Sequence, residues 1–566
     1  MRRYVLRILA LLTALVAGAQ AQSYLLWGQA GSGPSYQLGR KIAAAGDANG
    51  DGLADLVTGA AAFVGGSPVG QVLLLSGSDG AVLWSVVGTS NPGLGSAVAG
   101  VGDLDGDGHD DVAAGVPAGR LAHVLSGANG SVLLTLTGTG GAPFGYAVAG
   151  PGDLNGDGVP EILVGGVAGM LGAVTAYSGA NGSVLLTVTG TTPGDGFGTA
   201  AAGTGDVDGD GTPDFAVGAP RATPPPIFFP KAGEAFVFSG ATGLPVHSFQ
   251  GTAALDLFGT SLAGVGDVTG DGIPDVAVGA PQNDATGPWA SGPGYVRVHS
   301  GADGSLVHFW SGSLIGDAFG QTVAGGSDVD GDGVPDLVIG VPQFVDNGLS
   351  FLGPGYARVF SGANGSMLAT SQGSANNEGY GRAVAGLGDA DGDGFGDWAV
   401  GSPSACACGA NWGLVEVRSY AGIPPGSFLF DPGCPGSGGT VPLIQTGGGS
   451  PTVGNGQFSL LLSKALGNTT ALLLMGASAS SWGGIPLPLD LSALGMPGCF
   501  LLVSPDIVFA RTTSPAGLAS VPVPIPPIPS PVLIGAQIHF QWYVVDPGPL
   551  PAPGALTKRL RVLVLP

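Results

Sequence analysis

Short apolar runs alternate with polar, glycine-rich segments along most of the chain. Runs such as "DLVTGA", "DVAAGV" and "EILVGG" each follow a segment rich in aspartate and glycine. Runs of this length, bounded by turn residues, are typical of buried strands. Helical periodicity is hard to find after the first twenty residues, so the pattern predicts an all-β chain.

The polar segment before the apolar run occurs seven times, at intervals of 56, 50, 53, 61, 61 and 61 residues. An aromatic or leucine residue followed by glycine lies upstream of each acidic segment, and a sequence such as "SGANGS" lies downstream. A period of this size with strand-like content indicates a propeller or an array. The upstream steps are Leu38-Gly39, Leu94-Gly95, Phe144-Gly145, Phe197-Gly198, Phe258-Gly259, Phe319-Gly320 and Tyr380-Gly381.

Each unit predicts four strands, which is the content of a β-propeller blade. The first strand follows the aromatic–glycine step, the second follows the acidic segment, and the last two flank a hairpin whose Asn-Gly or Asp-Gly pair supplies positive φ. The seventh unit stops after Leu414–Gly422 without a fourth strand, whereas Ser23–Gln29 resembles one. We therefore expect the N-terminal segment to complete the seventh blade and remove an open sheet edge.

The acidic segments share the pattern D-x-[DNT]-x-D-G-x-x-[DE], with side-chain oxygens at positions 1, 3, 5 and 9 and a backbone carbonyl available at position 7. Hard oxygen ligands in an anionic loop suit Ca²⁺ better than Mg²⁺. Transition metals prefer His or Cys side chains, which do not occupy the side-chain ligand positions. The pattern predicts up to seven Ca²⁺ ions, one per blade. The predicted ligands are Asp47, Asn49, Asp51, Leu53, Asp55; Asp103, Asp105, Asp107, His109, Asp111; Asp153, Asn155, Asp157, Val159, Glu161; Asp206, Asp208, Asp210, Thr212, Asp214; Asp267, Thr269, Asp271, Ile273, Asp275; Asp328, Asp330, Asp332, Val334, Asp336; and Asp389, Asp391, Asp393, Phe395, Asp397.

Three other interpretations compete with calcium loops built into blades. Acidic turns without an ion are disfavoured because three or four clustered carboxylates repel one another. EF-hands or dockerin repeats need a helix after the loop and a Glu at position 12, and thrombospondin-like or nonapeptide arrays pack their loops more closely. We expect calcium to be structural, and binding to be weaker where Asn49, Asn155 and Thr269 replace a carboxylate.

In this order along the chain, the motifs resemble FG-GAP repeats, which form the propeller of integrin α subunits and of related bacterial extracellular proteins. The resemblance covers about Ser23 to Gly422, and literal "GAP" stands at Gly218-Ala219-Pro220 and Gly279-Ala280-Pro281. It implies a seven-bladed β-propeller with calcium loops in a secreted protein of bacterial type.

Composition and charge narrow the classes of function. The chain has 566 residues, of which 108 are Gly and 45 are Pro, as in proteins of many short strands and tight turns. The net charge of -23 argues against binding to nucleic acid or to anionic lipid. Because 25 of the 40 acidic residues occupy ligand positions of the loops, the rest of the chain is nearly neutral.

The N-terminus predicts a secretory signal peptide at residues 1–21, with three arginines, an apolar stretch and an Ala-Gln-Ala cleavage site. The apolar stretch is short for a membrane span, and no later segment is long enough for one. We therefore expect a secreted or cell-surface protein with no membrane span after cleavage, whose propeller occupies residues 22–422.

Residues 423–566 lack the acidic repeat, and their six strand-like runs predict a small β-sandwich-like domain. Surface attachment or sorting and a stabilising role both stay open for this domain. Export permits disulfides, and Cys434 with Cys499 is the preferred pair because both lie in "PGC". Cys406 and Cys408 could instead form a small strained ring or a weak metal site.

The sequence shows no nucleophile elbow, zinc-protease motif or phosphate-binding loop, so we expect no enzyme. A rigid disc of loops predicts an extracellular adhesion or protein-interaction module. A carbohydrate-binding or polysaccharide-degrading exoprotein is the alternative. Longer connections in three units offer Phe228, Phe229, Trp289 and Phe351 as candidate contacts for an extracellular protein or glycan, and the His109 side chain is expected to face solvent.

Overall fold

The chain divides into two compact units, one of residues 21–421 and one that contains residues 422–566. The computed structural model describes the first unit from Tyr24 to Tyr420, apart from short segments, and the strands of the second unit. In the first unit the segments outside the description are 32–35, 61–62, 65–66, 69, 89–92, 139–143, 167–170, 226–229, 284–291, 346–349, 352, 393 and 406–412. The predicted signal peptide and all four cysteines also lie outside the described residues.

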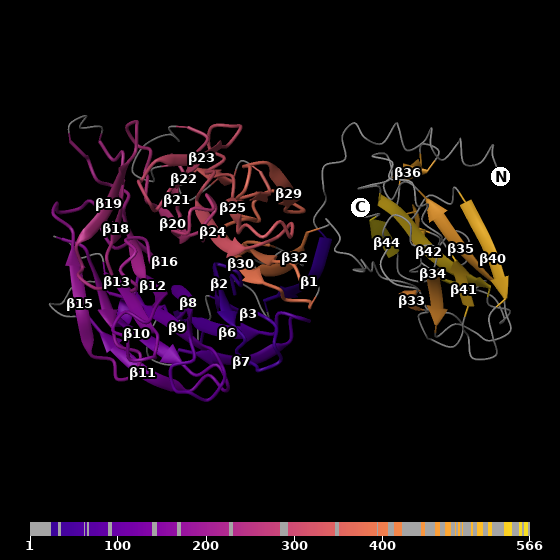
Figure 1. Ribbon diagram of the computed structural model, residues 1–566, viewed down its shortest axis with the longest axis horizontal. Coiled ribbons are helices and arrows are strands. Elements are labelled where there is room, and N and C mark those ends of the chain that lie inside the picture. Colours follow the sequence, from indigo (N-terminus) through magenta and orange to yellow (C-terminus); the bar gives the residue numbers. More distant parts are fainter. Residues whose placement is uncertain are drawn as a thin grey trace. The chain divides into compact units, whose positions relative to one another are not determined.

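Seven antiparallel sheets of four strands surround a central axis in the first unit, which confirms the predicted seven-bladed β-propeller (Figure 1). Blades one to three contain β2 (Lys41–Gly46), β3 (Asp55–Ala60), β6 (Gln71–Leu75) and β7 (Val82–Val87); β8 (Ala97–Gly102), β9 (Asp111–Val116), β10 (Leu121–Leu125) and β11 (Val132–Thr137); and β12 (Ala147–Gly152), β13 (Glu161–Gly166), β14 (Ala173–Tyr177) and β15 (Val184–Thr189).

The other blades repeat this order of strands. They contain β16 (Ala200–Gly205), β17 (Asp214–Ala219), β18 (Glu234–Phe238) and β19 (Pro245–Gln250); β20 (Ser261–Gly264), β21 (Val276–Ala280), β22 (Tyr295–His299) and β23 (Leu306–Ser311); β24 (Thr322–Ser327), β25 (Asp336–Val341), β28 (Tyr356–Phe360) and β29 (Met367–Gln372); and β30 (Ala383–Gly388), β31 (Asp397–Ser402), β32 (Leu414–Ser419) and β1 (Tyr24–Ala30).

The N-terminal strand β1 completes the seventh blade, as the sequence predicts. It pairs antiparallel with β32 from Tyr24 opposite Ser419 to Ala30 opposite Leu414, so the two ends of the propeller share one sheet (Figure 1). The Trp27 indole N–H then donates to the Gly77 carbonyl oxygen of blade one at 2.5 Å. The strand therefore pairs within blade seven and bonds to blade one, which closes the ring.

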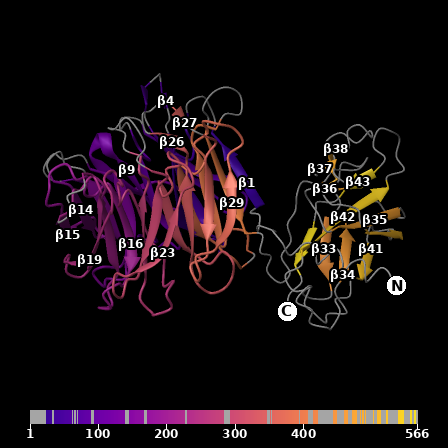
Figure 2. The ribbon, with the colours of Figure 1, turned by 90° about the horizontal axis from the view of Figure 1, so that it is seen from above.

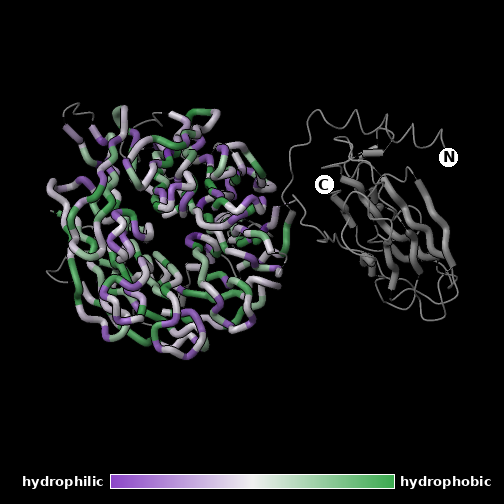
Figure 3. Tube along the Cα trace, in the orientation of Figure 1, coloured by the Kyte–Doolittle hydropathy of each residue, from purple (hydrophilic) through white to green (hydrophobic). Residues whose placement is uncertain are grey.

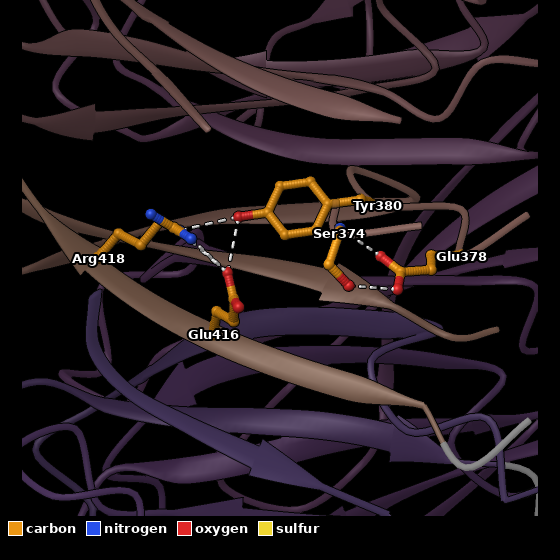
Figure 4. Close-up of polar contacts among 5 residues, drawn as sticks. All are labelled: Ser374, Glu378, Tyr380, Glu416 and Arg418. Atoms are coloured by element: carbon orange, nitrogen blue, oxygen red, sulfur yellow. Dashed lines mark hydrogen bonds and ion pairs between the residues drawn. The ribbon is translucent and has the colours of Figure 1, made fainter. Parts of the chain in front are cut away.

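A polar cluster lies on the β32 side of the same blade (Figure 4). Tyr380, from the aromatic–glycine step, donates its hydroxyl to the Glu416 carboxylate at 2.9 Å, and Arg418 binds both groups. Ser374 bonds to Glu378 through its backbone N–H and its hydroxyl. Tyr380, Glu416 and Arg418 belong to blade seven, whereas Ser374 and Glu378 lie in the connection from β29 of blade six, so these contacts stabilise the blade that receives the N-terminal strand and its link to blade six.

The hydrophobic core lies between neighbouring blades. Second strands such as β9 are buried at every residue, whereas fourth strands such as β7 are largely exposed, and hydrophobic and hydrophilic segments alternate around the ring (Figure 3). One core cluster, for example, joins Leu56 and Leu75 of blade one to Ala399 and Val417 of blade seven. Each blade therefore depends on its neighbours for its apolar burial.

The recurring aromatic–glycine and second-strand glycine motifs meet across these blade interfaces. Phe144 of blade three is buried, and Gly145 after it has a φ of 85°, in the left-handed region that favours glycine. A Cβ on Gly115 of blade two would lie 2.1 Å from the Gly145 carbonyl oxygen. Only glycine lets the two backbones approach this closely, so the two motifs of the repeat form one contact between blades.

The strand order places two kinds of connection on opposite faces of the propeller. The acidic segments join first strands to second strands on one face, where the 3–4 hairpins also turn. The aromatic–glycine steps and the 2–3 connections occupy the other face, along with the small hairpin of β4 (Phe63–Val64) and β5 (Ser67–Pro68) and that of β26 (Phe344–Val345) and β27 (Ser350–Phe351) (Figure 2). The short 3₁₀ turn η1 (Pro117–Gly119) is another of these 2–3 connections.

The second unit is also built from antiparallel strands, in agreement with the predicted β-sandwich-like domain. Its two larger sheets have the orders β33-β34-β41 and β40-β35-β42-β43, and β44 also pairs with β42. Its strands are β33 (Leu443–Gly447), β34 (Ser459–Ser463), β35 (Thr470–Gly476), β36 (Ser481–Trp482), β37 (Ile485–Pro486), β38 (Leu489–Asp490), β39 (Phe500–Leu501), β40 (Ile507–Thr512), β41 (Ala519–Pro522), β42 (Gln537–Val545), β43 (Gly554–Leu556) and β44 (Leu560–Leu563).

Candidate metal sites

The seven acidic segments form loops between the first and second strands of the blades. In each loop the carboxylate at position 1 accepts backbone N–H groups from the residues that follow. Asp103, for example, accepts from Gly106 at 2.7 Å and from Gly108 at 2.9 Å. Hydrogen bonding to backbone N–H groups stabilises the ionised form, and at the equivalent Asp153 it lowers the pKa of the carboxyl.

Carboxylate oxygens gather within 4.8 Å of one another in five of the loops. The groups are Asp103, Asp105 and Asp107; Asp153, Asp157 and Glu161; Asp206, Asp208 and Asp210; Asp328, Asp330 and Asp332; and Asp389, Asp391 and Asp397. Since Ca²⁺ takes six to eight oxygen ligands from one site, these converging oxygens match its donor chemistry. The predicted ligand Asp393 lies outside the described residues.

Loops one and five do not form such a group of three acidic residues within the described part of the chain. In loop one the Asn49 amide nitrogen donates to Asp51 at 3.1 Å and to Asp55 at 3.2 Å. In loop five the Thr269 hydroxyl donates to Asp267 at 3.2 Å. In loops one and five a neutral side chain therefore occupies position 3, where loops two, four, six and seven have an aspartate.

Loop three gathers its carboxylates by another route, although it also has asparagine at position 3. Glu161 replaces the usual aspartate at position 9, and its side chain is one methylene longer. Its carboxylate lies close to those of Asp153 and Asp157. The Asn155 amide donates to Glu161 at 2.7 Å. The structure thus shows a difference between loop three and loops one and five, although the sequence pattern predicts weaker binding in all three.

The residue at position 9 is buried and binds two parts of its blade. Asp111 accepts the Leu104 N–H from its own loop and the Gly127 N–H from the 3–4 hairpin, both at 2.9 Å. Burial raises the pKa of Asp111 to about 6, and it raises the pKa of the equivalent Asp336 to about 7. A cation beside these carboxylates would offset the cost of burying their negative charge.

The glycine that donates to position 9 contributes to the site, although the sequence pattern indicates only a hairpin turn there. The first glycine of the Ser-Gly turn has no space for a side chain. A Cβ on Gly127 would lie 2.1 Å from the Asp110 carbonyl oxygen, and one on Gly240 would lie 1.9 Å from that of Pro213. The recurrence of this glycine in the same register as the acidic loop is the signal that could have identified it.

We expect the substitution Gly127→Ala to destabilise the propeller by about 3 kcal/mol, because it forces the hairpin away from Asp111 and breaks a buried charged hydrogen bond. Calorimetric melting of the full chain measures this change. The matched control is Gly119→Ala in the exposed η1 turn, where a Cβ would be 3.3 Å or more from its neighbours. Equal melting temperatures for the two variants would contradict the assigned contact.

Neighbouring acidic loops contact one another around the ring. The Asp110 carboxylate of loop two accepts the Asp47 N–H of loop one at 2.9 Å. The Gly396 N–H of loop seven donates to the Asp328 carbonyl of loop six at 2.6 Å. Where position 8 is proline, its ring packs on the glycine before the preceding loop, as Pro160 does on Gly102.

The expectation that His109 faces solvent is wrong. Its ring nitrogen Nδ1 lies 3.0 Å from the Ala48 carbonyl oxygen of loop one, and the side chain is half-buried. Position 7 side chains reach the preceding loop in other blades as well, since Phe395 lies over Gly331. The imidazole therefore connects two loops, because the ring brings position 7 of each loop against its neighbour.

The backbone N–H groups of six position 7 residues form a recurring bond within their loops, while the role of the position 7 carbonyls as metal ligands stays a prediction. The N–H group donates to the carboxylate of position 5, as from Val334 to Asp332 at 2.9 Å. The same bond is formed by Leu53, His109, Val159, Thr212 and Ile273.

Comparison with known families agrees with this architecture. The FG-GAP repeat matches residues 39–75, 197–238, 258–299 and 319–356, and the FG-GAP-like repeat matches residues 103–164 and 153–217. Blades one to six of the propeller therefore carry FG-GAP repeats. The matches fall on blades one to six, and the structure adds the seventh.

This FG-GAP repeat protein is similar to animal integrin α subunits. It is 35% identical over 158 residues to integrin alpha-V of Gallus gallus and 36% identical over 157 residues to integrin alpha-7 of Rattus norvegicus. It is also 35% identical over 164 residues to integrin alpha-PS2 of Drosophila melanogaster. The matched segments cover 26–27% of this chain and 11–14% of those proteins, so the chain corresponds to only a small part of the length of these integrin subunits.

Several expectations for this FG-GAP repeat protein stay predictions. Phe228, Phe229 and Trp289 lie outside the described residues, and the description of Phe351 is limited to its place in β27. The bacterial type of secreted protein is likewise a prediction. Within the described part of the chain, no helix has the length and apolar character needed to cross a membrane.

Proposed function

We propose that this FG-GAP repeat protein is a secreted or cell-surface adhesion and protein-interaction module whose propeller is stabilised by calcium. The observation that carries the proposal is the closed ring of seven blades with an acidic loop in each, in a chain similar to integrin α subunits. The loops give the cation a structural role, and the opposite face offers connections of variable length for a partner. Loops positioned by a rigid scaffold are a common place for binding sites.

In each loop, positions 1, 3, 5 and 9 would supply the side-chain ligands and position 7 a carbonyl. The converging carboxylates of five loops and the raised pKa of the buried Asp111 support this donor set. The bound cation would supply positive charge that holds the loop, the second strand and the 3–4 hairpin together. Binding energy that exists only in the folded state adds to the stability of that state.

Parallel binding screens of the full chain test the proposal. The immobilised protein is exposed to a panel of extracellular proteins and to a glycan array, each in calcium and again in excess chelator. Saturable, calcium-dependent binding to a protein supports the adhesion function. Binding or turnover of glycans without a protein partner supports the carbohydrate-binding or polysaccharide-degrading alternative and contradicts the first proposal.

A further inference from the structure

A cavity of about 420 Å³ lies at the centre of the propeller. Each blade contributes to its lining the residues that directly follow its aromatic–glycine step, at the beginning of the first strand. The strand order places these residues on the face opposite the acidic loops. The segments are 40–42, 96–98, 146–148, 199–201, 260–262, 321–323 and 382–384.

The lining of this cavity is positively charged in an otherwise acidic protein. It contains Arg40, Lys41 and Arg382, and no acidic residue lines it among the residues that the structure describes. The chain has only 17 lysine and arginine residues and a net charge of -23. Three cations around one small volume therefore stand out against the overall charge.

Some hydroxyl groups of the lining donate to backbone carbonyls. The Ser96 hydroxyl donates to the Gly93 carbonyl at 2.6 Å, and the Thr260 hydroxyl donates to the Leu257 carbonyl at 2.6 Å. Both hydroxyl protons are thus used within their own turns. Recognition of a ligand by positive charge falls to Arg40, Lys41 and Arg382, and Tyr146, Thr199 and Gln321 are among the uncharged polar residues of the lining.

The three cations act on one another. The Lys41 side chain is exposed to the cavity, but the surrounding blades keep most bulk water away from its ammonium group. This partial desolvation lowers the pKa of Lys41 to about 8. The charges of Arg382 and Arg40 add to the effect. The other titratable side chain in the lining is Tyr146. An arrangement of like charges at close range favours the entry of an opposite charge.

We propose that this central cavity binds a small oxyanion, either free or as the carboxylate, sulfate or phosphate group of a larger ligand. The planar guanidinium groups of Arg40 and Arg382 suit the paired oxygens of such groups, and Lys41 supplies a compact third charge. The volume of about 420 Å³ accommodates a small molecule or a single acidic group. This proposal is independent of the adhesion function.

Isothermal titration of the full chain at pH 7 with citrate, sulfate and inorganic phosphate tests the proposal. Comparison of the three affinities shows whether the cavity prefers a carboxylate, a sulfate or a phosphate group. We expect at least one of them to bind at one ion per chain. The variants Arg382→Gln and Lys41→Gln are each expected to weaken that binding about tenfold or more. The control Arg120→Gln, at an exposed position outside the lining, should bind as the unchanged protein does.

The pH dependence of anion affinity gives a second test, which reports on the charge of Lys41 because the arginines stay protonated over the same range. Lys41 is protonated below a pH of about 8 and loses its charge above it. Anion affinity of the unchanged protein should therefore fall between pH 7 and pH 9.5, whereas the Lys41→Gln variant should lack this step. Without added anion, Lys41→Gln should melt at the same or a higher temperature, because it removes like-charge repulsion.

Two results would overturn the proposal. One is the failure of all three oxyanions to bind the unchanged protein at low ionic strength. The other is equal affinity of the unchanged protein and of both charge-removing variants, once their melting curves show that they are folded.

Discussion

Removal of divalent cations with excess EGTA is expected to lower the melting temperature of the propeller by about 10 °C or more. A ligand at a hundredfold its dissociation constant stabilises the folded state by about 2.7 kcal/mol per site, and several sites act together here. The structural reason is the buried position 9 carboxylate, such as Asp111, which joins loop and hairpin. Differential scanning calorimetry in 2 mM CaCl₂ and in EGTA, at about pH 7.5, measures the change.

Variants in one loop separate specific binding from a general effect of charge. Asp105→Asn removes a carboxylate from the cluster of loop two and should reduce the effect of calcium. Asp303→Asn, in an exposed hairpin turn where the side chain accepts the Ser305 N–H at 2.8 Å, is the matched control. It should retain the full effect. An unchanged melting temperature of the parent protein in EGTA would refute a structural role for calcium.

Deletion of residues 24–30 is expected to lower the melting temperature markedly and to cause self-association. The deletion removes β1 and leaves β32 as an edge strand with unpaired backbone groups. It also uncovers Val415 and Val417, which are fully buried in the closed ring. Calorimetry and light scattering after size-exclusion chromatography measure the two effects.

A smaller change tests the contact of β1 with blade one. Trp27→Leu keeps the strand but removes the indole N–H that binds the Gly77 carbonyl oxygen. It should destabilise the protein by about 1–3 kcal/mol and leave it monomeric. A deletion variant that melts like the parent and remains monomeric would show that ring closure is dispensable for the fold.

Features of the repeat that depend on local sequence were predictable. The strands, the acidic loops and the hairpin turns follow from apolar runs and from turn residues whose conformational needs are local. Even ring closure was predictable, because the seventh unit lacks a strand that Ser23–Gln29 resembles. The pairing of β1 with β32 confirms it.

Contacts between loops, hairpins and blades were not predictable, because they depend on how segments pack within a blade and against the next blade. The sequence shows the glycine of the Ser-Gly turn but not the Asp110 carbonyl oxygen that excludes a Cβ at Gly127. It places His109 in its loop but not against the Ala48 carbonyl of the loop before it. Thr269 and Asn155 look alike as replacements for a carboxylate, yet Glu161 restores an acidic group of three in one loop only.

The sequence by itself determined the all-β class, the seven units and the position of an acidic loop in each, because each of these features depends on a short repeated segment. Only the tertiary structure decided that the loops form a continuous ring and that a cationic cavity lies at the centre. Arg40 and Lys41 are near the start of the propeller and Arg382 is near its end. They come together because blade seven closes against blade one, which no local pattern of residues describes.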